Sequence, residues 1–299
     1  MNAGTSSSTD TVPRDVDDVT RADQVLVGVD GSAASIEALR WSASMIGRSG
    51  QAMTAVYAFS PTYAEMDPEQ YQAERTEAEH ALTGWCAGAG VSVETLVVGG
   101  GPGALLTMAE AHQVLLVVGT SGASGFARLH LGSVANHLAH HTSTPLGIVP
   151  IAAARDAVAR IVIGVDGSPG CAAAVEFCAR LASRVGATVV AVRAVEPYGV
   201  PESERPERDD DAVGAVHEWI APIEAAGVPV TVAIEHDVHP VAALCRAIEA
   251  EPNTLAIVGT RGLGGFSGLR LGGVALHLVH TTGAAVVLVP VPPHRPSNT

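Results

Sequence analysis

The sequence predicts an α/β protein built from two similar halves, and three observations carry this prediction. Short apolar runs alternate with segments that have apolar residues at helical spacing, which is typical of buried parallel strands covered by helices. A glycine-rich stretch at residues 119–133 returns at residues 259–273. The segment GVDGS at residues 28–32 returns at residues 164–168. The chain is therefore a tandem repeat of two doubly wound units with mostly parallel strands.

Size and composition agree with two buried cores. The chain has 299 residues, of which 47% are hydrophobic and only 4% aromatic, so that Val, Ala, Leu and Ile must fill the interior. Its longest apolar runs are shorter than a membrane span, and its polar opening residues do not resemble a signal peptide, so we expect a cytoplasmic protein without a membrane span. We expect a disordered tail over residues 1–22, one unit over 23–151 and a second over 159–291.

The charged residues exclude several function classes. A net charge of −14 disfavours nucleic acid as a partner, because phosphate backbones would be repelled over most of the surface. All 17 basic residues are Arg, so the chain has no Walker A lysine, Schiff-base lysine or lysine nucleophile. The four cysteines, Cys86, Cys171, Cys178 and Cys245, show no metal-binding spacing, and we interpret them as reduced core thiols.

The first half shows the expected alternation of strands and helices. Residues 24–30 form an apolar run stopped by Asp30, Gly31 and Ser32, and residues 33–47 follow as a helix with Ser32 as its N-cap. The further expected elements are strand Met53–Phe59, the long exposed helix Pro68–Ala89, strand 91–98, helix 103–112, strand 114–120, helix 132–141 and strand 145–150.

The second half repeats this order with one change of spacing. The offset between the halves is 166 − 30 = 136 at the GVDGS segments and 259 − 119 = 140 at the glycine-rich stretches. We assign the difference to an insertion near residues 197–211, which we interpret as an acidic surface loop.

The glycine-rich stretches and the aspartates predict a nucleotide site in each half. In an open parallel sheet, ligands bind outside the carboxyl ends of the strands, so Asp30 and the loop from Gly119 should flank one crevice. Glycines there would allow positive φ and a close approach to phosphate, and the helix after Gly132 would offer free N–H groups, with the Ser133 hydroxyl as a further donor. In the second half, the matching residues are Asp166, Gly259, Gly262 and Gly272, whereas Gly273 replaces the serine.

Each of these features also has a purely structural explanation. A glycine-rich loop often only turns the chain, and an Asp in such a turn often only caps a helix. The histidines His137, His140 and His141, matched in part by His277 and His280, have a spacing that metals use, but nothing marks a third ligand, so we predict no metal site. Three arginines in or beside the loops, Arg128, Arg261 and Arg270, could reach a phosphate or remain surface charges. The loop serines Ser121 and Ser124 do not form a GxSxG elbow.

Taken together, these residues resemble the universal stress protein family. Its motif of Gly, two residues, Gly, nine residues, Gly and then Ser or Thr is met by Gly119, Gly122, Gly132 and Ser133. The resemblance implies a five-stranded sheet ordered 3-2-1-4-5 in each half. It also implies ATP, with or without Mg²⁺, as the ligand, with phosphates on the loop, ribose near the Asp, and adenine at the end of the second strand. The expected ATP-binding residues are Asp30, Ala58, Gly119, Gly122, Gly132, Ser133 and Val134, and Asp166, Ala194, Gly259, Gly262, Gly272, Gly273 and Val274.

Three functions are compatible with this pattern. The first is a stress-response regulatory protein that binds ATP without catalysis, more weakly in the second half because Gly273 lacks a hydroxyl. The second is a slow ATP hydrolase, although neither glycine-rich stretch contains an acid. The third is a structural dimer module without nucleotide.

The family also implies how the two halves meet. The fifth strands, at residues 145–150 and 284–290, are apolar but would lie at sheet edges, which are a liability when exposed. In the family such edges pair antiparallel, so we expect Leu146 and Ile148 to pair with Val287 and Val289 across a pseudo-twofold axis. We further expect a homodimer of these tandem chains.

Overall fold

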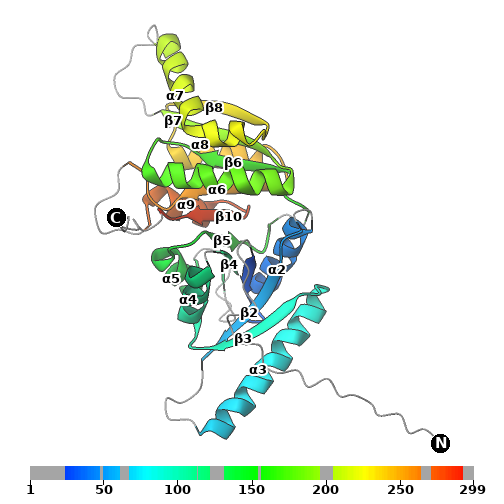
Figure 1. Cartoon of the computed structure of the whole chain (residues 1–299). Helices are drawn as coiled ribbons and strands as arrows, with labels where there is room; N and C mark the ends of the chain where they lie inside the picture. Colours follow the sequence, from blue (N-terminus) through cyan, green and yellow to red (C-terminus); the bar gives the residue numbers. More distant parts are fainter. Residues whose placement is uncertain are drawn as a thin grey trace, which may run out of the picture.

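The two halves form one continuous sheet with helices on both faces (Figure 1). The computed structural model describes residues 24–47, 50–60, 67–112, 114–121, 131–153, 156–195, 205–263 and 271–291. The strands are β1 Val25–Gly28, β2 Met53–Phe59, β3 Glu94–Gly99, β4 Leu115–Gly119, β5 Leu146–Val149, β6 Arg160–Gly164, β7 Thr188–Val195, β8 Val230–His236, β9 Thr254–Gly259 and β10 Val286–Val289. The helices are α2 Ala33–Ile46, α3 Pro68–Ala89, α4 Pro102–His112, α5 Ser133–His141, α6 Pro169–Val185, α7 Arg205–Ala225, α8 Pro240–Glu249 and α9 Gly273–Thr281.

The strand order confirms the predicted topology. The ten-stranded sheet runs β3-β2-β1-β4-β5-β10-β9-β6-β7-β8, so each half has the order 3-2-1-4-5. Neighbouring strands within each half are parallel, and β5 and β10 are antiparallel. The reversal at this one pair relates the halves by a pseudo-twofold axis.

The pairing of the fifth strands is confirmed, but its register differs from the prediction. Ile148 lies opposite Val286, and Leu146 lies opposite Leu288, whereas Val287 faces Gly147. Both strands are buried along their whole length. An apolar pattern without alternation does not specify which of two neighbouring registers is adopted, and this explains the one-residue error.

Two hydrophobic cores cover the sheet, one on each face. One core includes Leu39 of α2 and Leu82 of α3 together with Val175 of α6 and Ile220 of α7. The other contains apolar residues of α4, α5, α8 and α9. Each core therefore runs through both halves and is continuous across the β5–β10 pair.

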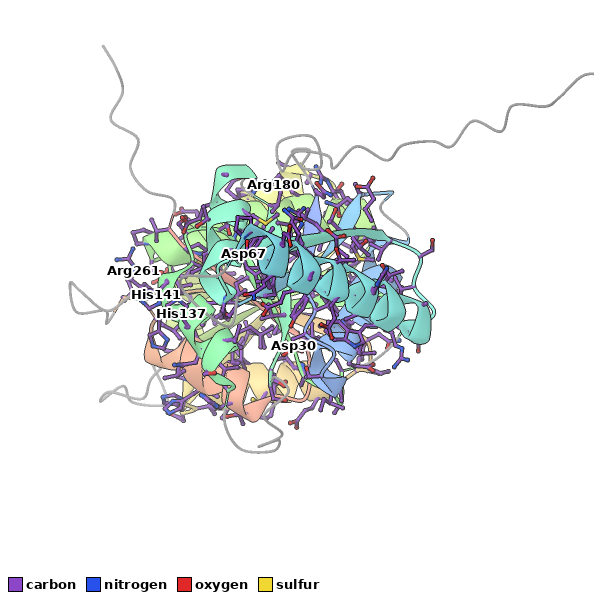
Figure 2. All side chains as sticks on the ribbon, turned by 90° about the horizontal axis from the view of Figure 1, so that it is seen from below. Asp30, Asp67, His137, His141, Arg180 and Arg261 are labelled. Carbon is purple, nitrogen blue, oxygen red and sulfur yellow. The ribbon has the colours of Figure 1, made fainter. Side chains whose placement is uncertain are left out.

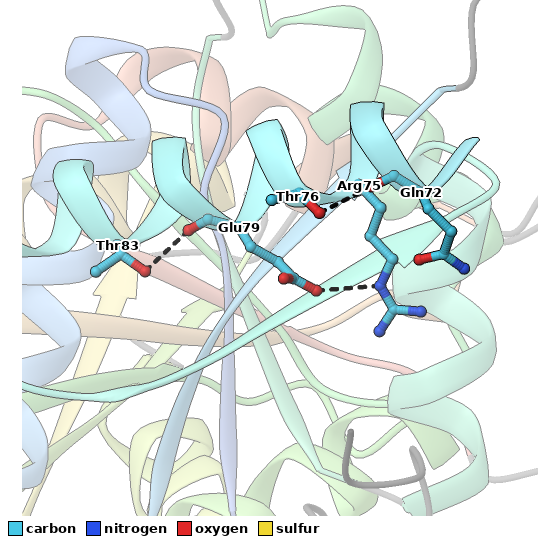
Figure 3. Close-up of polar contacts among 5 residues, drawn as sticks. All are labelled: Gln72, Arg75, Thr76, Glu79 and Thr83. Carbon is cyan, nitrogen blue, oxygen red and sulfur yellow. Dashed lines mark hydrogen bonds and ion pairs between the residues drawn. The ribbon is translucent and has the colours of Figure 1, made fainter. Parts of the chain in front are cut away.

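Helix α3 is a long solvated helix, as predicted. Its buried residues are Ala78, Leu82 and Cys86, and its outer face carries polar contacts along the helix (Figure 3). There Arg75 Nε donates to Glu79 Oε1 at 3.1 Å, and Thr83 Oγ1 donates to the Glu79 carbonyl at 2.8 Å. Exposed contacts of this kind contribute little to stability, so the buried residues hold α3 on the sheet.

Helix α7 corrects one expectation. Residues 205–211, which we interpreted as part of an acidic loop, form the first turns of α7. A proline second in the helix is favourable because it lacks one of the N–H groups that have no acceptor in the first turn. The acidic residues of this segment are also favourable there, because the free N–H groups carry partial positive charge. The remainder of that segment, residues 197–204, lies outside the described residues.

The cysteines lie in or beside the cores as free thiols. Cys86, Cys171 and Cys178 are buried and Cys245 is partly buried. Burial raises the pKa of all four thiols, in the case of Cys178 to about 12. They therefore stay protonated at neutral pH.

None of the helices that the structure describes is long and apolar enough to cross a membrane.

Replacing Ile148 by Lys should destabilise the protein by about 3 kcal/mol or more, because it places an unpaired charge in the antiparallel β5–β10 pair, which we call the seam. Ile148 is 1% exposed and lies on β5 opposite β10. The measurement is urea unfolding of the full chain. Ile151→Lys is the matched control, since Ile151 is 46% exposed just after the same strand. Equal unfolding midpoints for the two variants would contradict the seam assignment.

Candidate functional site

A cavity of about 120 Å³ lies at the carboxyl ends of β1 and β4 in the first half. It is lined by five of the predicted residues, Asp30, Ala58, Gly119, Gly132 and Val134. Ser133 is the first residue of α5 and is exposed beside this lining. Gly122 lies outside the described residues. Prediction and structure thus agree on where the crevice lies.

The second half has a larger cavity, of about 750 Å³, at the equivalent place. All seven residues predicted for this half line it: Asp166, Ala194, Gly259, Gly262, Gly272, Gly273 and Val274. The two linings have no residue in common. The structure therefore contains two separate crevices of different size.

In the first half, a serine ties the aspartate turn to the glycine loop. Asp30 Oδ1 accepts from the Ser32 N–H at 3.0 Å and so holds the turn in shape. Ser32 Oγ caps α2 by accepting from Ser35 N at 3.1 Å, and it also donates to the Ser121 carbonyl at 3.3 Å. The same hydroxyl thus fixes both sides of the crevice.

The second half repeats this arrangement and adds one contact. Ser168 Oγ accepts from Cys171 N at 3.1 Å and donates to the Arg261 carbonyl at 3.4 Å. Asp166 Oδ1 accepts from Ser168 N at 3.0 Å, and its Oδ2 accepts from Leu263 N at 3.3 Å. Both carboxylate oxygens of Asp166 are therefore engaged by backbone N–H groups.

The described glycines of the two loops do not have the positive φ that we predicted. Gly132 and Gly272, at φ −59° and −79°, have negative φ, and the described glycines with positive φ do not include Gly119 or Gly259. A Cβ on Gly119 would lie 2.5 Å from the backbone of Ala34, and one on Gly259 would lie 2.6 Å from Gly170. Glycine at these strand ends therefore allows close packing against the first turn of α2 or α6.

Positive φ occurs instead in the two aspartate turns. Gly31 has φ +79° and Gly167 has φ +73°, and each packs against an indole ring. A Cβ on Gly31 would lie 2.5 Å from Trp85, and one on Gly167 would lie 2.5 Å from Trp219. Sequence reasoning missed these tryptophans. Their presence in the second helix of both halves, in a chain with only three Trp, was the available signal.

The end of the second strand lies against the same indoles. Tyr57 meets Trp85 edge to face, with ring centroids 5.1 Å apart. At the matching place in the second half, the guanidinium carbon of Arg193 lies 5.3 Å from the centre of the Trp219 ring. Tyr57 and Arg193 line their respective cavities.

The helices after the loops present their N-termini to the crevices. Gly132 N donates to the Thr120 carbonyl at 2.7 Å, and Gly272 N donates to the Thr260 carbonyl at 2.6 Å, which closes the base of each loop. No described side chain caps α5 or α9. The first N–H groups of a helix have no intrahelical acceptor, so each crevice has a place for an anion.

The histidines after the first loop lie against each other on α5. His137 and His141 stack with ring centroids 4.3 Å apart, and His141 Nδ1 donates to the His137 carbonyl at 2.8 Å. Figure 2 shows both histidines near the margin of the view and Asp30 nearer the middle. Among the described residues, no group of three or more His, Cys, Asp or Glu could hold a metal. Arg128 and Arg270 lie outside the described residues.

Fold and site together define a tandem α/β protein with a crevice at the carboxyl ends of the strands in each half. The sequence model of the universal stress protein family matches residues 22–150 and 158–290. The chain therefore belongs to the universal stress protein family.

Sequence and structural similarity to individual proteins agrees with this membership. The chain is 28% identical to a universal stress protein of Mycolicibacterium smegmatis, over 89% of this chain and 96% of the relative. It is 26% identical to one of Mycobacterium tuberculosis, over 90% and 95%. The crystal structure of a universal stress protein from Archaeoglobus fulgidus has the same fold, with a TM-score of 0.68 at 19% identity, over 91% of this chain and 99% of that chain.

Replacing Gly31 by Ala should cost at least about twice as much stability as replacing Gly50 by Ala. Both glycines have positive φ, which costs an L-residue roughly 1–2 kcal/mol, but a Cβ on Gly50 has no atom within 4 Å, whereas one on Gly31 meets Trp85. The difference between the two variants in chemical unfolding isolates the indole contact. Equal losses would show that the turn does not need this packing.

Proposed function

We propose that the chain binds ATP, with or without Mg²⁺, in the crevice of each half and acts as a regulatory protein of the stress response. The observation that carries the proposal is the convergence of Asp30, the end of β4 at Gly119 and the start of α5 on one cavity. A carboxylate can accept from ribose hydroxyls, and the helix N-terminus favours phosphates. The backbone at Ala58 and Ala194 is then available to adenine.

The described residues support binding rather than hydrolysis. Phosphoryl transfer to water needs a group that positions the water, together with ligands for a metal. Asp30 is the acid among the described residues that line the first cavity, and its Oδ1 already accepts from Ser32 N. The glycine-rich stretches contain no Asp or Glu. The protein is therefore a binding protein in this proposal, and occupancy changes the surface that it presents.

The proposal also covers compartment and assembly. Four free thiols, protonated through burial, suit the reducing cytoplasm. The seam buries both fifth strands within one chain, which leaves the outer helix faces for a homodimer of tandem chains. A net charge of −14 disfavours nucleic acid as a partner.

Protein purified without added nucleotide should release ATP when it is denatured, as detected by mass analysis of the supernatant. The double variant Gly122→Glu and Gly262→Glu should release none, because each change puts a negative charge where the loop must approach phosphate. Circular dichroism would confirm that the variant is folded. If the native protein neither retains ATP nor binds it in calorimetry, the proposal fails. Phosphate release with Mg²⁺ at a steady rate would favour the hydrolase.

Replacing Ser133 by Ala should weaken ATP binding in the first half by up to about tenfold, since a neutral hydrogen bond contributes about 0.5–1.5 kcal/mol. The reciprocal change, Gly273→Ser, should strengthen binding in the second half by a similar factor. A side chain at Gly273 fits, because a Cβ there meets no atom within 4 Å. Titration calorimetry measures both effects. Unchanged affinities in both variants would remove Ser133 from the site.

A further inference from the structure

The two crevices differ at one matched position that faces the ligand space. Tyr57 and Arg193 are each the third residue from the end of the second strand of their half, directly before Ala58 and Ala194, and each packs on the tryptophan beneath the aspartate turn. The first crevice thus has a phenol where the second has a guanidinium. The charge at this position therefore differs between the halves, although a tryptophan lies against the side chain in both.

The charge balance of the two linings shifts in the same direction. Among the described residues that line the first cavity, Asp30 is the only one with a charged side chain. In the second, Arg193 and Arg261 accompany Asp166, and His239 and His277 line the rim. The loop segments outside the described residues do not cancel this difference, because residues 122–130 and 264–270 each contain one arginine and no acid. The second crevice is the more cationic one.

Arg193 can bind an anion although it is stacked. A guanidinium that lies over an aromatic ring keeps its N–H groups at its edge, where they can form a fork with two oxygens of a phosphate. The neighbouring carboxylate of Asp166 is held in position by the backbone N–H groups of Ser168 and Leu263. Asp166, Cys171 and Arg193 all line the same cavity.

We infer that the second crevice selects a nucleotide that carries a phosphate on its ribose as well as at its 5′ end. Gly272 and the N-terminus of α9 take the 5′ phosphate, and Arg193, which lines the same cavity as Asp166, takes the ribose phosphate. The cavity of about 750 Å³ has room for the additional group, whereas the first cavity, which Tyr57 lines at the matched position, is smaller at about 120 Å³. This inference rests on the proposed function, which places ribose near the aspartate.

The three tryptophans allow each crevice to be read separately in the full chain. Trp85 lies at the first crevice and Trp219 at the second, while Trp41 is buried on α2. Fluorescence of a Trp85→Phe variant therefore reports on the second crevice, and that of a Trp219→Phe variant reports on the first. Trp41 gives the same background in both.

The ligands to compare are 5′-AMP, adenosine 2′,5′-bisphosphate and adenosine 3′,5′-bisphosphate. At the second crevice, one of the bisphosphates should bind at least about tenfold more tightly than AMP, because a charge-assisted hydrogen bond contributes about 1.5–3 kcal/mol. At the first crevice, neither should bind more tightly than AMP, since its charged lining group is Asp30.

Arginine variants then identify the residue responsible. Arg193→Met keeps an apolar stem against Trp219 and should abolish the gain, and Tyr57→Arg should create a gain at the first crevice. Arg180→Met is the matched control, because Arg180 is 62% exposed on α6, apart from Arg261 in Figure 2, and should leave the gain unchanged.

The outcomes separate this inference from the function it rests on. If AMP and ATP bind but the added phosphate gives no gain at the second crevice, or a gain that survives Arg193→Met, the inference is wrong and nucleotide binding stands. If calorimetry and fluorescence show no nucleotide binding at either crevice, the proposed function fails as well.

Discussion

The antiparallel pairing of β5 with β10 is the interaction on which the rest of the structure depends. It removes the apolar edge that each five-stranded sheet would otherwise expose, and on each face of the sheet it joins the core of one half to that of the other. It also decides where ligands can bind. Because the strands of the two halves run in opposite directions, their carboxyl ends point to opposite sides of the molecule. The two crevices consequently have no lining residue in common.

Much of the fold could be predicted because its elements are separated by clear local signals. Strand Met53–Phe59 and helix Pro68–Ala89 were predicted with the bounds observed, since Ser60 with Pro61 stops the strand and Gly90 ends the helix in the left-handed region. The register of β5 and β10 and the start of α7 were wrong. Both depend on tertiary packing: two strands apolar on both faces fit either register, and an acidic segment becomes helical only where a core holds the later turns of the same helix.

The sequence predicted the position of the crevice, but it did not predict the contacts that hold the surrounding turns and loops. Asp30 and the loop at Gly119 meet because the carboxyl ends of parallel neighbours lie at one edge, which the repeat pattern already implied. The reason for glycine at position 119 is its distance from Ala34, and the reason at position 31 is the indole of Trp85. Such contacts join residues far apart in the chain, so no local pattern reveals them. The left-handed turn at Gly31 therefore had to be seen in the structure.

The two halves share the contacts that hold the aspartate turn, and they differ in side chains that line the crevice. The aspartate turn with its positive-φ glycine, the serine that ties the turn to the loop and the tryptophan beneath it recur in both halves. Each of these residues makes a contact on which the local backbone depends, so a change there costs stability. Side chains that face the crevice do not form the turn or its link to the loop, although Tyr57 and Arg193 touch the tryptophans. There the halves differ, with Tyr57 against Arg193 and Ser133 against Gly273. A difference in ligand between the halves must therefore arise from the walls, and it can do so without any change of fold.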